Sequence, residues 1–333
     1  MSDLDEIKRI AGEENVLCEE PLSKHTTFHI GGNAKIFVMP QYIEDLVALL
    51  DYVRRQNLRY FVMGNGSNLL AYDTGYDGIV IATHMAGKTV KEKADKTALD
   101  TLQILMPGDL NRKKILAEEQ TETEGKTIIF AGSGIMLSNM AAKAAKAGLT
   151  GFEFAGGIPG TLGGACVMNA GAYGGEMKDV LETVTVLTRD GDVKTLTKDE
   201  LELGYRTSVI AKKDYIVLSA VIRLENGRKE EIKAVMDDLK EKRITKQPLE
   251  YPSAGSTFKR PEGYFAGKLI QDAGLRGFQV GGAQVAEKHC GFVVNKDQAT
   301  AADVMNLMNQ VSDKVYEMSG VRLEPEVKRL GVF

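Results

Sequence analysis

A glycine-rich segment at residues 151–175 is the feature of this chain that most directly indicates a bound ligand. It reads GFEFAGGIPGTLGGACVMNAGAYGG, with nine glycines among its 25 residues. This composition is too apolar for a flexible linker and too rich in glycine for an ordinary helix or strand. Glycine lets the main chain bend with φ above zero and approach a flat or phosphorylated group closely. The segment therefore predicts a large bound cofactor.

Two shorter glycine turns point the same way. Gly64-Asn-Gly66 follows the predicted strand Tyr60–Met63, and Gly132-Ser-Gly134 follows another strand and precedes a helix, whose N-terminal N–H groups can bind an anion. A plain turn explains either one alone, because Leu69 replaces the third glycine of a dinucleotide motif. Together with residues 151–175 they favour a dinucleotide. Since the turns contain no Lys or Arg, main-chain N–H groups are expected to hold it.

Three polar residues stand apart from their local settings. Arg206 lies in a turn-like segment between strands, and Ser256 follows a glycine that allows an exposed hydroxyl. Glu326 lies in a strand expected at about 321–329, where alternation places it on one face with three other charged residues. The alternative to a reactive role is a solvated face for Glu326 and local turn bonding for Ser256.

The histidines and cysteines give no metal-ligand pattern. Four scattered histidines are expected to be surface or hydrogen-bonded residues: His25, His29, His84 and His289. The three cysteines are odd in number and show no C-x-x-C spacing, which argues against a disulfide framework or a zinc site. No metal is expected.

The apolar pattern predicts a compact β-α-β unit at the start of the chain. Residues 34–39 and 60–63 read as strands on either side of an amphipathic helix at 42–56. Residues 84–126 are polar and mixed in charge, and they read as a long, partly mobile excursion between two strands.

A second β-containing part follows the excursion. It has a helix at about 137–147, a hairpin that turns at Arg189-Asp-Gly191, and a strand at 215–224. From about residue 226 an α+β pattern begins. Helices are expected at about 229–243, 264–273 and 301–319, and strands at about 278–285, 289–294 and 321–329. The inward residues of the first and last of these helices are expected to be Ile232, Val235, Met236 and Leu239, and Val304, Met308, Val311, Val315 and Met318.

Size and composition bound the class of protein. The chain has 333 residues, 43% apolar and 26% charged, which suits a globular protein of two or three domains. Its net charge of −4 gives no basic field for nucleic acid. No signal peptide and no run of ~20 apolar residues is found, so we expect a cytoplasmic protein that does not associate with a membrane.

A series of motifs, in order from about residue 21 to the C-terminus, resembles the UDP-N-acetylenolpyruvoylglucosamine reductase family, also called UDP-N-acetylmuramate dehydrogenases. The stretches that carry the resemblance are His25-Thr-Thr-Phe-His-Ile-Gly-Gly-Asn-Ala34, Gly64-Asn-Gly-Ser-Asn-Leu69, Gly157-Ile-Pro-Gly-Thr-Leu-Gly-Gly164, Met168-Asn-Ala-Gly-Ala-Tyr-Gly174, Gly204-Tyr-Arg-Thr-Ser208, Lys246-Gln-Pro-Leu-Glu-Tyr-Pro252, Gly255-Ser-Thr-Phe-Lys259, Ala266-Gly-Lys-Leu-Ile-Gln-Asp-Ala-Gly274 and Leu323-Glu-Pro-Glu-Val327.

The resemblance implies an α+β fold: a two-lobed FAD-binding domain of the vanillyl-alcohol-oxidase (PCMH) type, followed by a smaller α+β substrate-binding domain. The expected boundaries are 1–80 for lobe 1, 81–225 for lobe 2 and 226–333 for the substrate domain. The excursion at 84–126 is longer than the family pattern. The chain resembles the shorter form of the family, which lacks an extra tyrosine-bearing loop near the start of the third domain.

The resemblance also implies an activity in peptidoglycan precursor synthesis. NADPH would reduce a non-covalent FAD, whose N5 would deliver hydride to the vinyl carbon of UDP-N-acetylglucosamine enolpyruvate, giving UDP-N-acetylmuramate. A flavin is needed because side chains alone do not transfer hydride. By motif match, Arg206 would bind the substrate carboxylate as enolate charge develops, Glu326 would assist it, and Ser256 would donate a proton to carbon.

The remaining expected site residues come from the same motifs. The expected cofactor contacts are Gly64, Asn65, Gly66, Ser67, Asn68, Gly132, Gly134, Gly157, Ile158, Pro159, Gly160, Gly164, Asn169 and Gly171. The expected substrate contacts are Tyr205, Arg243, Gln247, Lys259, Lys268 and His289, and a plain surface role is the alternative for Arg243, Gln247, Lys259 and Lys268. A monomer is expected.

Two other hypotheses stay open at this point. Another flavin oxidase on the same FAD scaffold would lack Ser256 and Glu326 in these contexts and often tethers its flavin through His or Cys. A nucleotide-sugar binding module without redox chemistry would be colourless when purified.

Overall fold

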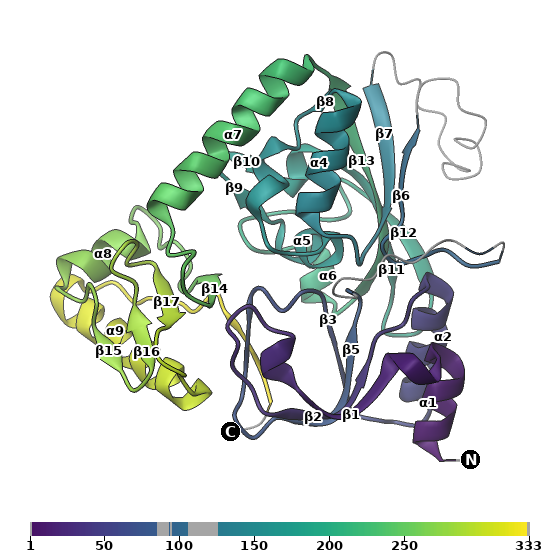
Figure 1. The fold of residues 1–333 in the computed structure, drawn as a ribbon, viewed down its shortest axis with the longest axis horizontal. Helices are drawn as coiled ribbons and strands as arrows, with labels where there is room; N and C mark the ends of the chain where they lie inside the picture. The colour runs from purple at the N-terminus through teal and green to yellow at the C-terminus, as the bar shows by residue number, and fades with distance from the viewer. Residues whose placement is uncertain (1, 85–92, 94, 106–125, 332–333) are drawn as a thin grey trace.

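The computed structural model describes residues 2–84, 93, 95–105 and 126–331. Figure 1 shows two sheet-based bodies stacked on one side of the molecule and a smaller α+β body on the other, joined by one long helix. The C-terminal chain returns to the first body, so its last described residues lie beside the N-terminal half of the protein.

The first body is a four-stranded sheet with the order β1-β2-β5-β3. Its strands are β1 (Val16–Pro21), β2 (Asn33–Val38), β3 (Tyr60–Met63) and β5 (Tyr76–Ala82). β5 lies between β2 and β3 and is parallel to both. Helices α1 (Asp3–Ala11) and α2 (Ile43–Arg55) pack together beside this sheet, because α2 buries Leu46, Leu49, Leu50 and Val53 along one face.

The second body is built on a sheet with the order β12-β11-β13-β7-β6. Its strands are β6 (Leu102–Leu105), β7 (Lys126–Gly132), β11 (Leu181–Leu187), β12 (Val193–Thr197) and β13 (Ile216–Asn226), with β8 (Leu149–Thr150) off the edge of β13. One face is covered by α4 (Leu137–Ala147), η3 (Glu153–Gly157) and α5 (Leu162–Met168), and the short α6 (Val209–Lys212) lies against α5. The glycine-rich segment 151–175 is therefore a compact cover on this sheet.

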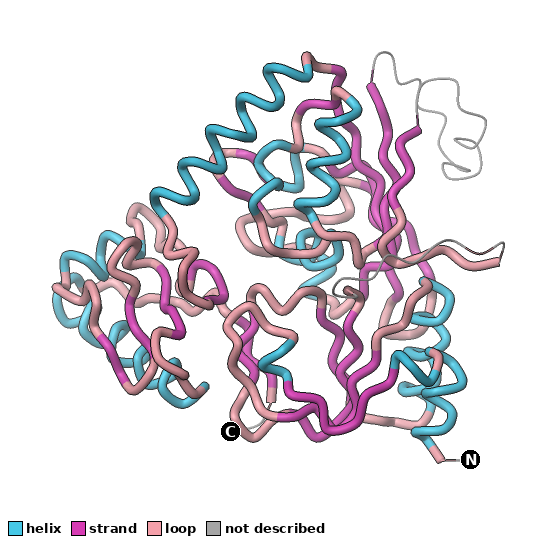
Figure 2. The backbone as a smooth tube through the Cα atoms, viewed as in Figure 1, coloured by secondary structure: helices cyan, strands magenta, loops and turns pink. Residues whose placement is uncertain are grey.

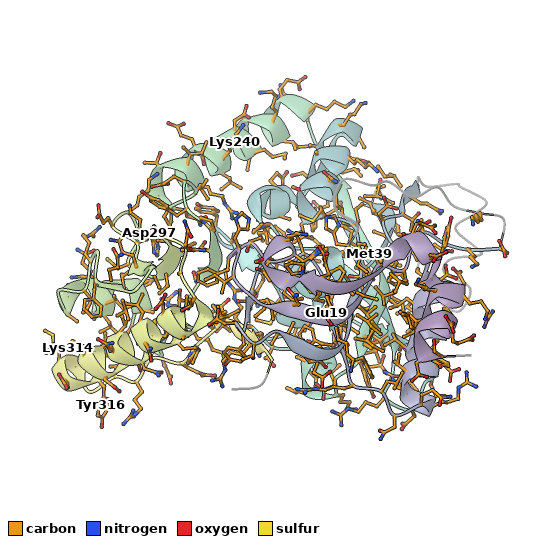
Figure 3. The ribbon with its side chains drawn as sticks, turned by 60° about the horizontal axis from the view of Figure 1, so that its bottom comes forward. Glu19, Met39, Lys240, Asp297, Lys314 and Tyr316 are labelled. Carbon is orange, nitrogen blue, oxygen red and sulfur yellow. The ribbon has the colours of Figure 1, made fainter. Side chains whose placement is uncertain are left out.

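The C-terminal body has a four-stranded sheet with the order β14-β17-β16-β15. These strands are β14 (Ser253–Ser256), β15 (Gln279–Val280), β16 (Ala283–Val285) and β17 (Phe292–Asn295). Helices α8 (Ala266–Asp272) and α9 (Ala301–Ser319) pack on it, as the tube in Figure 2 shows. α7 (Lys229–Lys246) connects this body to the second sheet; it packs on α4 and η3, and its outer face carries exposed charges such as Lys240 (Figure 3).

The C-terminal and first bodies share contacts that fix one against the other. β18 (Lys328–Leu330) pairs in parallel with β4 (Leu69–Ala71). Asp73 accepts hydrogen bonds from the first N–H groups of α9, those of Ala301 and Ala302, at 2.8 and 3.2 Å. The hydrophobic core of the C-terminal body also includes Phe28, Ile30, Leu70 and Tyr72 from the first body. These contacts hold the C-terminal segment in place beside the turn at Gly64.

Most predicted elements are confirmed within a few residues, including the helices at 42–56, 137–147 and 301–319 and the hairpin at Arg189-Asp-Gly191. Residues 84–126 are not a plain excursion, because β6 lies inside them and pairs with β7. The expectation of mobility there falls largely on residues outside the described part of the chain.

Three sequence predictions are wrong in detail. Residues 278–285 form two short strands, because Gly281, with φ +53°, turns the chain between them. Residues 321–327 form no strand beyond one bridge at Pro325, which has no N–H to donate to a ladder. Two residues expected to face inward are exposed: Val235, at 48%, because α7 packs on the second body along only part of its surface, and Met318, in the last turn of α9.

Candidate active site

A cavity of about 350 Å³ lies where the second body, the C-terminal sheet and the segment before β18 meet. It brings together the three residues singled out for chemistry, Arg206, Ser256 and Glu326, which are far apart in the sequence. The predicted substrate residues Tyr205, Lys268 and His289 also line it.

Arg206 is presented by a tight turn. Gly204 and Thr207 exchange main-chain hydrogen bonds at 3.1 and 3.2 Å, so Tyr205 and Arg206 form the tip of a two-residue loop. Arg206 has φ +55°, a backbone region that costs energy for a residue other than glycine and clusters at functional sites. Its guanidinium lies 5.2 Å from the centre of the Tyr205 ring. The turn therefore aims a cation and an aromatic ring at the cavity.

Ser256 is the last residue of β14 and lines the same cavity. Gly255 before it has φ +76°, and an added Cβ there would meet nothing within 4 Å. The hydroxyl of Ser256 makes no hydrogen bond to any described residue, so the local turn bonding considered for it is not found. Ser256 is thus an exposed hydroxyl at the end of a strand, as the preceding glycine indicated.

Glu326 is buried, not part of a solvated face. Only 9% of the residue is exposed, and its Oε1 accepts a hydrogen bond from Arg206 Nε at 2.5 Å. Its Oε2 is buried and has no hydrogen-bond partner in the described part of the chain. Burial raises the pKa of the Glu326 carboxyl, and the charge of Arg206 opposes this effect without cancelling it. The carboxyl therefore keeps its proton to a higher pH than an ordinary glutamate does.

The main chain ties Glu326 to the neighbour of Ser256. The Glu326 N–H donates to the Thr257 carbonyl at 2.8 Å, and the Thr257 hydroxyl accepts from the Val293 N–H at 2.8 Å. These bonds place Ser256 and Glu326 on the same wall of the cavity.

Several lining residues were missed by the sequence analysis. These are Phe258, Arg260, Phe265, Gln271, Arg276, Lys288 and Cys290. The Arg260 guanidinium lies 4.0 Å from the centre of the Phe265 ring, and Phe265 is 62% exposed. The exposure of Phe265 is seen only in the structure, and Arg276 and Lys288 come from loops with no motif of their own.

The predicted substrate cations differ in how they are placed. Lys268 lines the cavity and forms an ion pair with Asp272, and Lys259 forms one with Glu324. His289 accepts a hydrogen bond from the Gly291 N–H at 3.1 Å through Nδ1, and burial lowers the pKa of its ring. Lys259 is not among the residues that line the cavity.

Arg243 and Gln247 also lie outside this cavity. The Arg243 guanidinium is 6.0 Å from the centre of the Tyr173 ring, and a Cβ on Gly157 would come within 2.7 Å of its Nε. Burial lowers the pKa of Arg243, and it forms no ion pair with a carboxylate of the described residues. Arg243 is therefore a cation held over the glycine-rich segment, near the end of α7.

The structure brings two of the glycine motifs together. Asn65 Nδ2 donates to the Pro159 carbonyl at 2.8 Å, and a Cβ on Gly64 would meet Thr161 Oγ1 at 2.3 Å. Gly66 has φ +61°, and a Cβ there would meet the His25 carbonyl at 2.2 Å. Within the described chain, no acceptor takes the main-chain N–H groups of residues 65–68. Free N–H groups on a glycine turn suit a phosphate group.

The other predicted cofactor residues take packing positions. A Cβ on Gly132 or Gly134 would clash with the carbonyl of Leu99 or Thr83, at 2.4 and 2.1 Å, so both glycines allow neighbouring main chain to pack closely against them. Gly171 starts the small hairpin of β9 (Gly171–Ala172) and β10 (Gly175–Glu176). Ile158, Gly160 and Gly164 lie in the segment that faces the 64–68 turn, where a Cβ on Gly160 would contact Ser67 Oγ at 3.5 Å.

A second cavity, of about 170 Å³, adjoins the 64–68 turn. Three histidines line it, His25, His29 and His84, together with Gly64 and Asn65. The expected hydrogen bonds are found for two of these histidines: His25 Nε2 lies 3.1 Å from Glu20 Oε1, and His84 Nδ1 lies 3.2 Å from the Gly134 carbonyl.

Comparison with known proteins agrees with this arrangement. A sequence model described as an FAD binding domain matches residues 34–100 and 108–197. A second, described as the C-terminal domain of UDP-N-acetylenolpyruvoylglucosamine reductase, matches residues 247–330. An FAD-binding domain joined to this cavity defines an FAD-dependent oxidoreductase.

The particular family follows from full-length relatives. UDP-N-acetylenolpyruvoylglucosamine reductase from Agathobacter rectalis is 52% identical to this chain, over an alignment that covers 96% of this chain and 95% of the relative. The reductase from Lachnoclostridium phytofermentans is 48% identical, with 98% and 97% covered. The crystal structure of UDP-N-acetylenolpyruvylglucosamine reductase from Thermus caldophilus has a TM-score of 0.71 and 33% identity over 95% of this chain and 98% of its own. The chain belongs to the UDP-N-acetylenolpyruvoylglucosamine reductase family.

These findings confirm the predicted family and the predicted fold class, an FAD-binding domain followed by a smaller mixed α/β domain. Of the helices in the described ranges, none has both the length and the apolar character to cross a membrane. Among the same residues there is no cluster of three or more His, Cys, Asp or Glu side chains suited to a metal ion.

Proposed function

We propose that this protein reduces UDP-N-acetylglucosamine enolpyruvate to UDP-N-acetylmuramate in peptidoglycan precursor synthesis, with non-covalent FAD and with NADPH as the reductant. The names of the full-length relatives support the reaction. The observation that carries the proposal is the single cavity that holds the Arg206–Glu326 pair and Ser256. A cation, a buried carboxyl with a raised pKa and a free hydroxyl together suit the reduction of a carbon–carbon double bond next to a carboxylate.

The residues of the 64–68 turn and the 157–164 segment fit FAD. The turn offers main-chain N–H groups that are unpaired within the described chain, and Arg243 adds a half-buried cation without a carboxylate partner among the described residues. When bound, FAD supplies the hydride, which no protein side chain carries. Gly132, Gly134 and Gly171 would contribute to the FAD site indirectly, because neighbouring main chain can pack against residues that have no side chain.

Arg206 would bind the substrate carboxylate and stabilise the charge that develops on it. Its Nε is bonded to Glu326, and its two terminal nitrogens remain for a ligand. A guanidinium stays charged and can bind two oxygens at once. A donor fixed in place before the reaction lowers the barrier because it needs no reorganisation when the charge appears.

Ser256 would donate a proton to the carbon that bears the carboxylate. Its hydroxyl is free of protein partners in the described chain and is on the same wall as Glu326. A placed proton donor contributes ~10²–10⁴-fold. Glu326 would assist through Oε2, which is buried and has no partner among the described residues, by hydrogen bonding or by protonating the enolate.

The rest of the cavity would hold the sugar nucleotide. Tyr205, Lys268 and His289 line it, and Lys259 lies beside Glu324 near its edge. Gln247 and Arg243, at the end of α7, would contact the sugar nucleotide only if that ligand extends beyond this cavity. We further propose the division 1–80, 81–225 and 226–333, the shorter form of the family, and a monomer in the cytoplasm, where nucleotide sugars and NADPH are made.

Visible absorbance of the purified protein tests this function. We expect a yellow protein that releases flavin on denaturation, is bleached by NADPH, and regains its colour when the enolpyruvyl sugar nucleotide is added without oxygen. A colourless protein that still binds the nucleotide sugar would favour a binding module. Colour that returns only with oxygen would favour an oxidase.

A further inference from the structure

Two asparagine side chains hold the main chain beside the two members of the Arg206–Glu326 pair. Asn68 ends the 64–68 turn, and its Nδ2 donates to the Glu326 carbonyl at 3.2 Å. Asn169 ends α5, and its Nδ2 donates to the Gly204 carbonyl at 3.1 Å. Both asparagines belong to the glycine-rich motifs that were expected to contact the cofactor, so each links one of these motifs to one half of the pair.

Asn68 completes the fixation of the Glu326 peptide. The N–H of Glu326 is bonded to Thr257, and its carbonyl is bonded to the Asn68 amide. The Asn68 carbonyl in turn accepts from the Lys328 N–H at 3.0 Å, and the parallel pairing of β18 with β4 starts there. Because the main-chain N–H and carbonyl of Glu326 are both hydrogen-bonded, its main chain is restrained on both sides of the Cα.

Asn169 holds the turn that presents Arg206. It is fully buried and has φ +43°, a conformation that asparagine tolerates better than most residues. Its Nδ2 also donates to Glu176 Oε2 at 2.7 Å, and its Oδ1 accepts from the Lys178 N–H at 2.9 Å. Both N–H groups of the amide are therefore used inside the protein, so its side chain is better suited to positioning than to binding a cofactor.

We infer that Asn68 and Asn169 are positioning residues that align the Arg206–Glu326 pair with the two cofactor motifs. This inference rests on the proposed function for its kinetic consequence. Asn68→Ala removes one neutral hydrogen bond, which changes global stability little, whereas loss of the buried Asn169 amide removes three hydrogen bonds and costs more. A misplacement of about 1 Å in a reacting group can cost about 10²-fold in rate. Loss of either amide should therefore impair the chemistry that the pair supports more than folding or cofactor binding.

The kinetic test uses Asn68→Ala and Asn169→Gly in the FAD-loaded protein. Glycine at 169 keeps the left-handed backbone and removes only the side chain. We expect reoxidation of the reduced flavin by the substrate to slow by about 10- to 100-fold, with flavin content kept and reduction by NADPH within about twofold. If Asn169→Gly does not fold, Asn68→Ala carries the test alone, because it removes a single neutral hydrogen bond.

Two control variants match these changes away from the pair. Asn295 Nδ2 donates to the Phe28 carbonyl at 3.1 Å across the same junction of bodies, so Asn295→Ala matches Asn68→Ala. Asn57 is exposed and has φ +52°, so Asn57→Gly makes the same substitution in the same left-handed backbone conformation as Asn169→Gly. Equal slowing in the controls, or no slowing in the test variants, would overturn the inference.

Titration of the Glu326 carboxyl gives a readout that needs no turnover. It can be followed by isotope-edited infrared spectra, with Glu326→Gln as the reference for assignment. The charged groups that act on this carboxyl are Arg206, Lys259 and Lys328. Asn68→Ala should lower its pKa by admitting water, and Asn169→Gly should raise it by moving the Arg206 charge away. A pKa unchanged in both variants would overturn the positioning role even if the substrate proved to be a different molecule.

Discussion

The Arg206→Lys variant tests whether a fixed guanidinium, and not merely a positive charge, is what the site requires. Arg206 Nε is bonded to Glu326 Oε1 at 2.5 Å, and its terminal nitrogens, which have no hydrogen-bond partner among the described residues, are those that we propose to bind the substrate carboxylate. Lysine keeps the charge but carries all its donors on one nitrogen, so it cannot bond Glu326 through one nitrogen and bind two carboxylate oxygens through two others, as a guanidinium can.

The expected loss follows from removing one preorganised donor. Such a loss costs about 10²–10³-fold in rate, or about 2.7–4 kcal/mol, and the retained charge of lysine places this variant near the lower figure. We therefore expect reoxidation of the reduced flavin by substrate to slow about 10²-fold. Reduction of the flavin by NADPH should stay within about twofold, because the proposed role of Arg206 belongs to the reaction with substrate and not to flavin reduction.

Stopped-flow absorbance at the flavin band measures the two half-reactions separately. Arg223→Lys is the matched control, because Arg223 donates to Glu182 at 2.8 Å and its side chain is 23% exposed, against 21% for Arg206. Reoxidation within about threefold of the parent protein, or equal slowing of both half-reactions, would refute the guanidinium argument.

Three further predictions follow from the same contacts. Ser256→Ala should leave reduction by NADPH intact and slow reoxidation by ~10²–10⁴-fold; equal slowing of both steps in stopped flow would remove Ser256 from the role of proton donor. Because burial raises the pKa of Glu326, its carboxyl loses its proton only above the ordinary pH range for a glutamate, and the rate of reoxidation should fall as pH rises through that raised pKa. Glu326→Gln should abolish this fall in the pH profile. If the variant keeps the fall, another group is responsible for it. Asp73→Ala removes the carboxylate from the start of α9 and should lower the free energy of unfolding by about 1 kcal/mol in urea titrations. Asp77→Ala, which removes an exposed ion pair, should change that free energy little. Similar losses in the two variants would contradict the capping role of Asp73.

The sequence alone determined the elements with strong local signals. The α2 and α9 helices are set by apolar residues at helical spacing, and the turn at Arg189-Asp-Gly191 by residues that favour a hairpin. The glycine motifs marked where main chain approaches closely, and Gly64 and Gly66 prove to have no room for a Cβ. These features depend on residues that are near one another in the chain, so a single sequence is enough to show them.

Only the tertiary structure decided how the site is assembled. Alternation around Glu326 suggested a solvated face, yet the residue is buried against Arg206, which lies 120 positions away in the chain. Asn68 and Asn169 were expected to contact the cofactor, and nothing in the sequence indicated that their side-chain amides donate to the carbonyls of Glu326 and Gly204. Burial, pairing and the pKa of a carboxyl depend on neighbours brought in by distant segments, and no local pattern records which neighbours these will be.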